Sequence, residues 1–198
     1  MFASLSVLAL GFSAFKIAEV LPLGATMPMA EHKMKDVSGK ELSMKDAMMK
    51  HGVMVMFSCN TCPYVVKNQE RTIAIADFAR KMDIGVILLN SNEAYRSSDD
   101  SFEEMVSYAK NQKYNWPYVV DKDHKIADAF GANRTPEVFL FNKELKLVYH
   151  GAIDDNPSDA SSVNRKHLRE AILELTSGKE ISVKESRSVG CTIKRNKN

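Results

Sequence analysis

The chain has 198 residues, of which 26% are charged and 44% hydrophobic, a composition typical of one globular domain that can bury a core. Its 27 basic and 25 acidic residues leave a formal net charge of +2, so there is no electrostatic basis for binding nucleic acid. The three cysteines and five histidines do not have the spacing of a zinc or other metal site.

An apolar run at the start of the chain, Phe2 to Phe15, ends in small residues and has the form of the hydrophobic region of a signal peptide. The run is short for a membrane span, so we expect export without stable insertion in a membrane. No lysine or arginine precedes it, which leaves an ordinary apolar N-terminus and a cytoplasmic protein as the alternative. We predict a signal segment over 1–24, as in a periplasmic or otherwise extracytoplasmic protein, a domain over 25–180 and a C-terminal tail over 181–198.

Apolar periodicity and turn residues predict alternating strands and helices through this domain. In chain order the expected elements are a β-hairpin within 35–43, a short helix over 44–50, a strand over 53–57, a long helix over 63–82, a strand over 84–89, a polar loop over 90–100, a helix over 101–112, a strand over 116–121, a short helix over 126–130, a hairpin of strands over 137–142 and 145–150, and a helix over 163–176. The continuous apolar run over 84–89 is typical of a strand buried on both faces of a parallel sheet. An α/β fold is therefore predicted.

A C-x-x-C motif, Cys59-Asn60-Thr61-Cys62, stands where the strand over 53–57 gives way to the long helix. A sulfur at a helix N-terminus faces unpaired backbone N–H groups and the positive end of the helix dipole, and both favour the thiolate. Two cysteines at this spacing can also close on each other. We predict a redox dithiol in which the pKa of Cys59 lies below the value of about 8.5 for a free thiol. Half of a zinc site and a pair of inert buried cysteines are the alternatives.

The third cysteine, Cys191, lies in a polar C-terminal stretch whose composition favours a free thiol on a mobile tail. An odd cysteine is a hazard in an exported protein, however, and Gly190-Cys191-Thr192-Ile193 is a short apolar segment that could dock on the domain. A docked tail would bring Cys191 near the C-x-x-C pair, as a second resolving thiol or as a guard of Cys59. A disulfide there would need Cα atoms within roughly 7 Å of each other.

Several motifs in a fixed order give the chain a resemblance to thioredoxin-like redoxins that extends over about residues 20–195. They are CNTCPYV, NSNEAY, WPYVVD, TPEVFLFN, YHGAIDDNP and the terminal GCTIK. The chain resembles the branch that contains the alkyl hydroperoxide reductase/thiol-specific antioxidant proteins and the exported TlpA/ResA-like thiol-disulfide oxidoreductases. The resemblance implies a thioredoxin-like fold with an N-terminal β-hairpin and a redoxin-type helix-strand insertion over 101–121.

The same resemblance implies roles for individual residues. Cys59 would be the attacking thiolate and Cys62 the resolving thiol. Thr135 would present its backbone to the substrate beside a cis bond to Pro136, although a trans bond is the ordinary expectation for any single X-Pro pair.

Other positions are less decisive. Tyr64 and Trp116 could line the mouth of the site, and core packing explains such aromatic residues equally well. Thioredoxin has a buried aspartate six positions before the first cysteine, and this chain has Val53 there. Glu70 or water would then accept the proton of Cys62, while a solvated glutamate on a helix face is the ordinary interpretation of Glu70.

The leading functional prediction is a thiol-disulfide oxidoreductase that takes electrons from a thiol donor and acts on disulfides of partner proteins, with no cofactor. A thiol peroxidase is the first alternative, although the P-x-x-x-[TS]-x-x-C motif of peroxiredoxins precedes neither Cys59 nor Cys62. A metal carrier like the Sco copper proteins is the second alternative. Those proteins have three residues between their cysteines and this chain has two, while His124 and His150 have ordinary surface interpretations.

Overall fold

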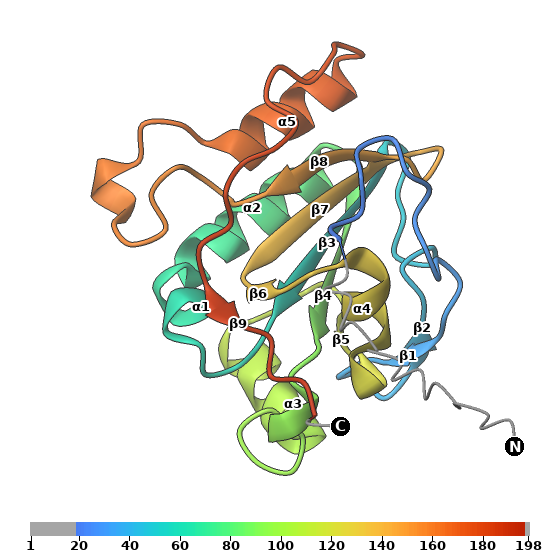
Figure 1. Cartoon of the computed structure of the whole chain (residues 1–198), viewed down its shortest axis with the longest axis vertical. Helices are drawn as coiled ribbons and strands as arrows, with labels where there is room; N and C mark the ends of the chain where they lie inside the picture. Colours follow the sequence, from blue (N-terminus) through green and yellow to red (C-terminus); the bar gives the residue numbers. More distant parts are fainter. Residues whose placement is uncertain (1–18, 197–198) are drawn as a thin grey trace, which may run out of the picture.

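The computed structural model describes residues 19–196, so the apolar run from Phe2 to Phe15 lies outside the described residues. A five-stranded sheet forms the centre of the protein, with strands in the order β5-β4-β3-β7-β8 (Figure 1). These strands are β3 (Gly52–Ser58), β4 (Ile84–Asn90), β5 (Tyr118–Val120), β7 (Glu137–Asn142) and β8 (Leu147–Gly151). β3, β4 and β5 are parallel, and β7 pairs antiparallel with both β3 and β8. The predicted α/β architecture is confirmed.

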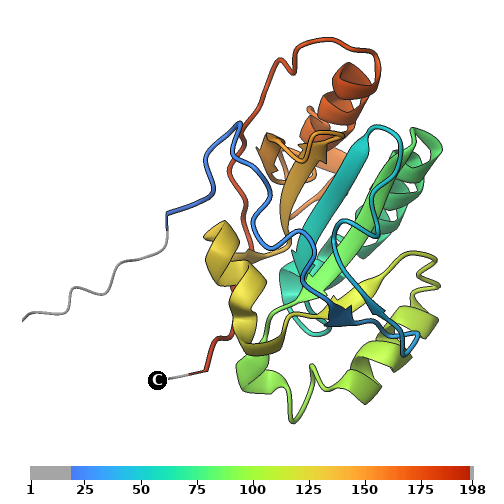
Figure 2. The same cartoon turned by 90° about the vertical axis from the view of Figure 1, so that its right-hand side faces the viewer.

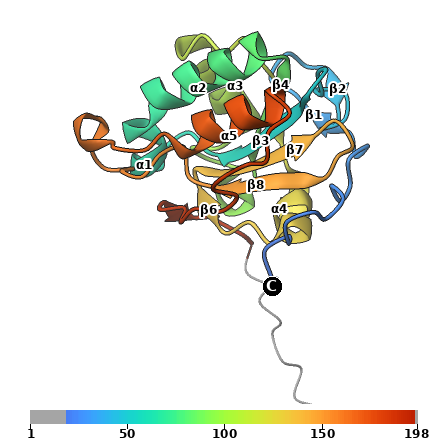
Figure 3. The same cartoon turned by 90° about the horizontal axis from the view of Figure 1, so that it is seen from above.

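Helices cover both faces of this sheet. They are α1 (Pro63–Lys67), α2 (Gln69–Lys81), α3 (Phe102–Asn111), α4 (Lys125–Phe130) and α5 (His167–Thr176). α2, α3 and α5 pack on one face, and α4 packs on the other together with the N-terminal segments (Figures 2 and 3). Within residues 19–196, no helix combines the length and the apolarity that crossing a membrane requires.

Short strands complete the fold. β1 (Met34–Lys35) and β2 (Glu41–Leu42) form the N-terminal hairpin that the sequence predicts. β6 (Arg134–Thr135) pairs with β9 (Cys191–Thr192), so the chain end returns to a point just before β7. Three 3-10 turns are also present: Glu93–Tyr95 follows β4, Lys122–His124 follows β5, and Ala160–Ser162 precedes α5.

The central strand β3 is buried on both faces. Met54 and Met56 belong to the core under α2, α3 and α5. Val53, Val55 and Phe57 alternate with them and belong to the core under α4. All five side chains are fully buried. A strand between two helical layers needs apolar residues at every position, which explains why this stretch of the sequence lacks the alternation of a half-exposed strand.

The long helix predicted over 63–82 is wrong, because the chain breaks at Asn68 into α1 and α2. Asn68 has φ −95 and ψ 3, and its side-chain amide donates to the carbonyl oxygens of Tyr64 at 2.7 Å and Pro157 at 3.0 Å. An asparagine side chain that bonds to nearby backbone competes with the regular helical hydrogen bonds. The C-x-x-C motif therefore leads into a separate short helix.

The helix predicted over 44–50 is also wrong, since the chain forms turns and one isolated bridge there. Ser43 does act as a cap would, because its hydroxyl accepts the backbone N–H of Asp46 at 3.2 Å. The helix does not continue because Met49 forms a backbone bridge with Gly52 and already turns the chain into β3. A second boundary differs as well: the helix predicted from position 163 begins at His167.

Candidate redox site

The C-x-x-C motif lies at the corner between β3 and α1, as the sequence predicts. Cys62 is the N-cap residue of α1. Cys59 is 1% exposed and Cys62 is 6% exposed. With Val65 they form a small apolar cluster against which Tyr64 and Cys191 pack. The motif is therefore buried, and the third cysteine of the chain, Cys191, contacts it.

Cys62 forms a disulfide with Cys191, and Cys59 is a free thiol. The two bonded residues are 129 positions apart in the sequence, and their Cα atoms are 6.1 Å apart. The sequence motif suggests a bond within the C-x-x-C pair, and in this structure Cys62 is bonded to the C-terminal segment instead. The part that Cys191 plays in chemistry, as a resolving thiol or as a guard, stays a prediction.

Backbone pairing brings Cys191 to the motif. In the antiparallel pair of β6 and β9, Thr135 is opposite Cys191 and Arg134 is opposite Thr192. A Cβ atom on Gly190 would collide with the carbonyl oxygen of Thr135, so glycine is the residue that allows this close approach. β9 lies beside β6 in Figures 1 and 3. The tail is thus docked on the domain rather than mobile.

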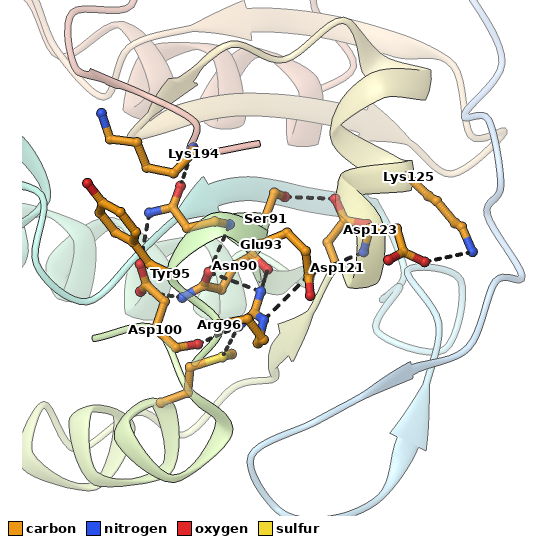
Figure 4. A network of polar contacts seen from close by, with 12 residues as sticks. Asn90, Ser91, Glu93, Tyr95, Arg96, Asp100, Asp121, Asp123, Lys125 and Lys194 are labelled. Atoms are coloured by element: carbon orange, nitrogen blue, oxygen red, sulfur yellow. Dashed lines mark hydrogen bonds and ion pairs between the residues drawn. The ribbon is translucent and has the colours of Figure 1, made fainter. Parts of the chain in front are cut away.

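Residues after Cys191 anchor the tail further. Ile193 is 3% exposed and belongs to the core under α4. The backbone N–H of Lys194 donates to Oδ1 of Asn92 at 2.8 Å, so the tail joins the network of Figure 4. Arg195 donates to a carboxylate oxygen of Asp128 at 2.8 Å and to the carbonyl oxygen of Ala132 at 2.7 Å. These non-covalent contacts add to the disulfide in holding the tail on the domain.

Thr135 contacts the sulfur atoms of both cysteines in the motif. Its peptide bond to Pro136 is cis. Its hydroxyl oxygen lies 3.5 Å from Sγ of Cys59, and its carbonyl oxygen lies 3.3 Å from Sγ of Cys62. Because Thr135 is also opposite Cys191 in the β6–β9 pair, this one residue neighbours all three cysteines.

A buried contact between Glu137 and His150 supports the turn before Thr135, and sequence reasoning missed it. Oε1 of Glu137 lies 2.8 Å from Nε2 of His150, and Oε2 accepts the backbone N–H groups of Asn133 at 2.8 Å and Arg134 at 3.0 Å. Glu137 is 5% exposed. A charged residue inside the apolar run TPEVFLFN was the available signal, since a buried carboxylate needs partners.

The surface interpretation of His150 is wrong, because its side chain is 13% exposed and is hydrogen-bonded to Glu137. His124 bonds to Asp128, with 2.7 Å between Nδ1 and Oδ2. Among residues 19–196, no group of three or more His, Cys, Asp or Glu side chains is arranged to hold a metal ion.

A buried carboxylate fixes the second residue of the motif. Oδ1 of Asp100 accepts the backbone N–H of Asn60 at 2.9 Å and the amide of Asn90 at 2.7 Å, while Oδ2 accepts the amide of Asn92 at 2.9 Å. The hydroxyl of Tyr118 donates to the side-chain oxygen of Asn60 at 2.9 Å. Figure 4 shows Asp100 and Asn90 within this network. The polar loop over 90–100 is therefore packed behind the motif, where it orients the peptide between the cysteines.

Burial raises the pKa of the Cys59 thiol, and the negative charge of Asp100 acts in the same direction. Hydrogen bonds from the Thr135 hydroxyl and from the backbone N–H groups of Cys62 and Thr61 oppose this shift without cancelling it. The prediction of a lowered pKa is therefore wrong for this form of the protein. The N-cap position of the helix belongs to Cys62, whereas Cys59 is buried in an apolar cluster and is affected by the charge of Asp100.

Alkylation of Cys59 in the oxidised protein should be slow at pH 7 and should accelerate about tenfold per pH unit until the pH passes the raised pKa, because only the thiolate reacts. Asp100→Asn removes the neighbouring negative charge and should move this profile to lower pH. Asp99→Asn, at an exposed neighbouring position, is the matched control and should leave the profile unchanged. The measurement is the rate of iodoacetamide labelling by mass spectrometry; a midpoint below about 8.5 in the unaltered protein would contradict the expectation.

The remaining candidate residues are placed differently. Tyr64 packs on the cysteine cluster. Trp116 is 6% exposed within the core under α2, with its ring centroid 5.0 Å from that of Tyr114. Glu70 is exposed in the first turn of α2. The structure therefore brings Tyr64 to the cysteines and places Trp116 and Glu70 outside their cluster, and the roles of all three residues stay predictions.

A C-x-x-C corner beside a cis proline, on a mixed sheet covered by helices on both faces, defines a thiol-redox protein of the thioredoxin-like fold. The family model described as Redoxin matches residues 22–166, and the chain belongs to this family. The resemblance found in the sequence is thereby confirmed.

Solved structures extend the comparison. An uncharacterized conserved protein from Geobacillus kaustophilus is 30% identical, with a TM-score of 0.83 over 89% of this chain and 94% of its own. A hypothetical protein from Sinorhizobium meliloti 1021 is also 30% identical, with a TM-score of 0.80 over 91% of this chain and 98% of its own. The thioredoxin domain of a thiol-disulfide oxidoreductase from Bacteroides vulgatus shares the fold at 18% identity, with a TM-score of 0.55 over 67% of this chain and 89% of its own. No protein with a curated description matches the chain.

Proposed function

We propose that the protein is a thiol-disulfide oxidoreductase that exchanges disulfides with cysteine-containing partner proteins through Cys59 and Cys62. The observation that carries this proposal is that one cluster holds a disulfide, at Cys62, and a free thiol, at Cys59. A thiol beside a disulfide is the reactant pair of thiol-disulfide exchange. The fold shared with the Bacteroides vulgatus oxidoreductase domain agrees with this chemistry.

The proposed reaction proceeds in two exchanges. In the reduced protein the thiolate of Cys59 attacks a partner disulfide, which forms a mixed disulfide and releases one partner thiolate. Cys62 then attacks the sulfur of Cys59, which releases the second partner thiol and leaves a disulfide in the site. A dithiol donor reduces that disulfide and returns the protein to its starting state.

Insulin reduction by dithiothreitol tests this proposal. The protein should accelerate the precipitation of insulin chains, and Cys59→Ser should remove the acceleration because the attacking sulfur is lost. Peroxide consumption, measured in parallel with the same donor, should be slow. An unaltered protein that leaves the insulin reaction at its uncatalysed rate would refute the proposed function.

One contact favours a thiol peroxidase as the second candidate. The hydroxyl oxygen of Thr135 lies 3.5 Å from Sγ of Cys59 and could orient a peroxide there. Thr135 belongs to β6 and not to a peroxiredoxin sequence motif. This candidate ranks second because the P-x-x-x-[TS]-x-x-C motif of peroxiredoxins precedes neither Cys59 nor Cys62. Rapid peroxide turnover that falls in Thr135→Val would reverse the ranking.

We also propose an extracytoplasmic location. A disulfide that ties the tail to the domain suits an oxidising compartment, and the apolar run from Phe2 to Phe15 supplies a candidate export signal. Fractionation of cells that express the full chain tests this location, and recovery in the cytoplasmic fraction with residues 1–24 still attached would contradict it.

A further inference from the structure

We propose that Cys191 is a third redox residue, and that the protein interconverts a tail-bound form, with the Cys62–Cys191 disulfide, and a tail-released form, with a Cys59–Cys62 disulfide. This inference rests on the proposed function in one respect, namely that a partner protein makes use of the exchange. The exchange itself is internal, so it can be measured with no partner present.

The geometry around Thr135 carries this inference. Its hydroxyl oxygen lies 3.5 Å from Sγ of Cys59, its carbonyl oxygen lies 3.3 Å from Sγ of Cys62, and its backbone pairs with Cys191. Cys59 and Cys62 belong to one buried cluster, against which Cys191 packs. The free thiol therefore lies in the same small cluster as the disulfide, and Cys62 is the sulfur that both disulfides would share.

The step is an isomerisation that balances without any added oxidant or reductant. The thiolate of Cys59 attacks Sγ of Cys62, a Cys59–Cys62 bond forms, and the Cys62–Cys191 bond breaks. Cys191 leaves as a thiolate and takes up from solvent the proton that Cys59 gave up. One disulfide and one thiol are present before and after the step.

The exchange would control access to the site. In the tail-bound form β9 occupies the edge of β6 beside Pro136, and Cys59 is 1% exposed. After the exchange only non-covalent contacts, such as that of Ile193 with the core under α4, hold the tail. An extended segment of a partner protein could then displace the tail and pair with β6 in its place. The tail thus acts as a built-in competitor of the partner.

Peptide mapping reads out the two forms. Trypsin would place Cys59 and Cys62 together on the peptide 51–67 and Cys191 on the peptide 188–194. A tail-bound molecule gives the two peptides linked, whereas a tail-released molecule gives 51–67 with an internal disulfide and a free thiol on 188–194. The protein is oxidised to one disulfide per chain, held at a chosen pH, quenched in acid, and its free thiol is labelled with N-ethylmaleimide before a non-reducing digest.

The unaltered protein should show the label on both Cys59 and Cys191, in a ratio that is the same whatever the starting mixture. The approach to this ratio should become faster as pH rises, because Cys59 must lose its proton first. Cys59→Ser should give only the linked peptides and Cys191→Ser only the internal disulfide. A label confined to one of these two cysteines in the unaltered protein, at every pH tested, would overturn the proposal.

Two tail variants test the docking without touching a cysteine. Gly190→Val forces a side chain against the carbonyl oxygen of Thr135 and should shift the ratio about tenfold or more toward the Cys59–Cys62 form. Ile193→Ser removes the buried anchor and should shift it in the same direction. Thr192→Val, at an exposed position, is the matched control and should leave the ratio unchanged. An unchanged ratio in both Gly190→Val and Ile193→Ser would contradict the role of docking.

The same samples separate this inference from the proposed function. Exchange between the two disulfides without any insulin reduction would support the three-cysteine site and refute the oxidoreductase. Insulin reduction by a protein that keeps one fixed disulfide would support the oxidoreductase and refute the three-cysteine site.

Discussion

Replacing Cys62 with serine is expected to lower the rate of catalysed insulin reduction by at least about 100-fold, to the uncatalysed background. Cys62 is bonded to Cys191 in the structure and is the resolving partner of Cys59 in the proposed reaction. In the proposed reaction Cys62 is the sulfur that resolves a mixed disulfide at Cys59, and in the structure Cys191 is bonded to Cys62 and not to Cys59. The measurement is the initial rate of insulin precipitation with a fixed concentration of dithiothreitol.

The same variant should accumulate partner proteins as mixed disulfides on Cys59, visible as reducible adducts on a non-reducing gel. Val66→Ser is a suitable control. It also introduces a serine, and Val66 is 56% exposed on α1, the helix that Cys62 caps. It should keep the full rate and trap nothing. A Cys62→Ser protein that keeps a rate close to that of the unaltered protein would show that the reaction does not pass through Cys62.

The Cys62–Cys191 disulfide is expected to raise the free energy of unfolding much more than a Cys59–Cys62 disulfide does. Cys59→Ser can form only the bond between Cys62 and Cys191, which are 129 positions apart, whereas Cys191→Ser can form only the bond within the C-x-x-C motif. The chain-entropy model gives about 5 kcal/mol for a loop of the first length and about 2 kcal/mol for a loop of four residues. The longer loop removes more freedom from the unfolded chain.

Urea unfolding of each variant, oxidised and reduced, measures this difference. The loss of unfolding free energy on reduction should be larger in Cys59→Ser than in Cys191→Ser, by about 3 kcal/mol in the entropy model. Each variant carries one cysteine-to-serine change, so each serves as the control of the other. Equal losses in the two variants would mean that the long-range bond does not form in solution.

Local patterns were enough to predict most of the fold. The apolar runs of β3 and β4 lie between two helical layers, as continuous hydrophobic runs imply. Ser101 caps α3 by accepting the backbone N–H of Glu104 at 3.3 Å, as its position before an acidic first turn predicts. Gly131 ends α4 with φ 64. Each of these features depends on residues that are neighbours in the sequence.

Features that depend on distant parts of the chain were beyond this reasoning. The break at Asn68 involves a hydrogen bond to Pro157, 89 positions away. The partner of His150, a residue interpreted from the sequence as a surface histidine, is Glu137 on the neighbouring strand. A periodic pattern reports which face of an element is buried, and it does not report which distant polar group lies opposite.

The amino-acid sequence by itself determined the α/β fold, the C-x-x-C corner between β3 and α1, and the resemblance to redoxins. Tertiary structure decided which sulfurs lie together and how readily they ionise. Cys191 reaches Cys62 only because β9 pairs with β6, and the pKa of Cys59 is raised because burial and Asp100 outweigh the hydrogen bonds to its sulfur. Both outcomes depend on desolvation and on contacts between segments far apart in the chain, which only the packed fold creates.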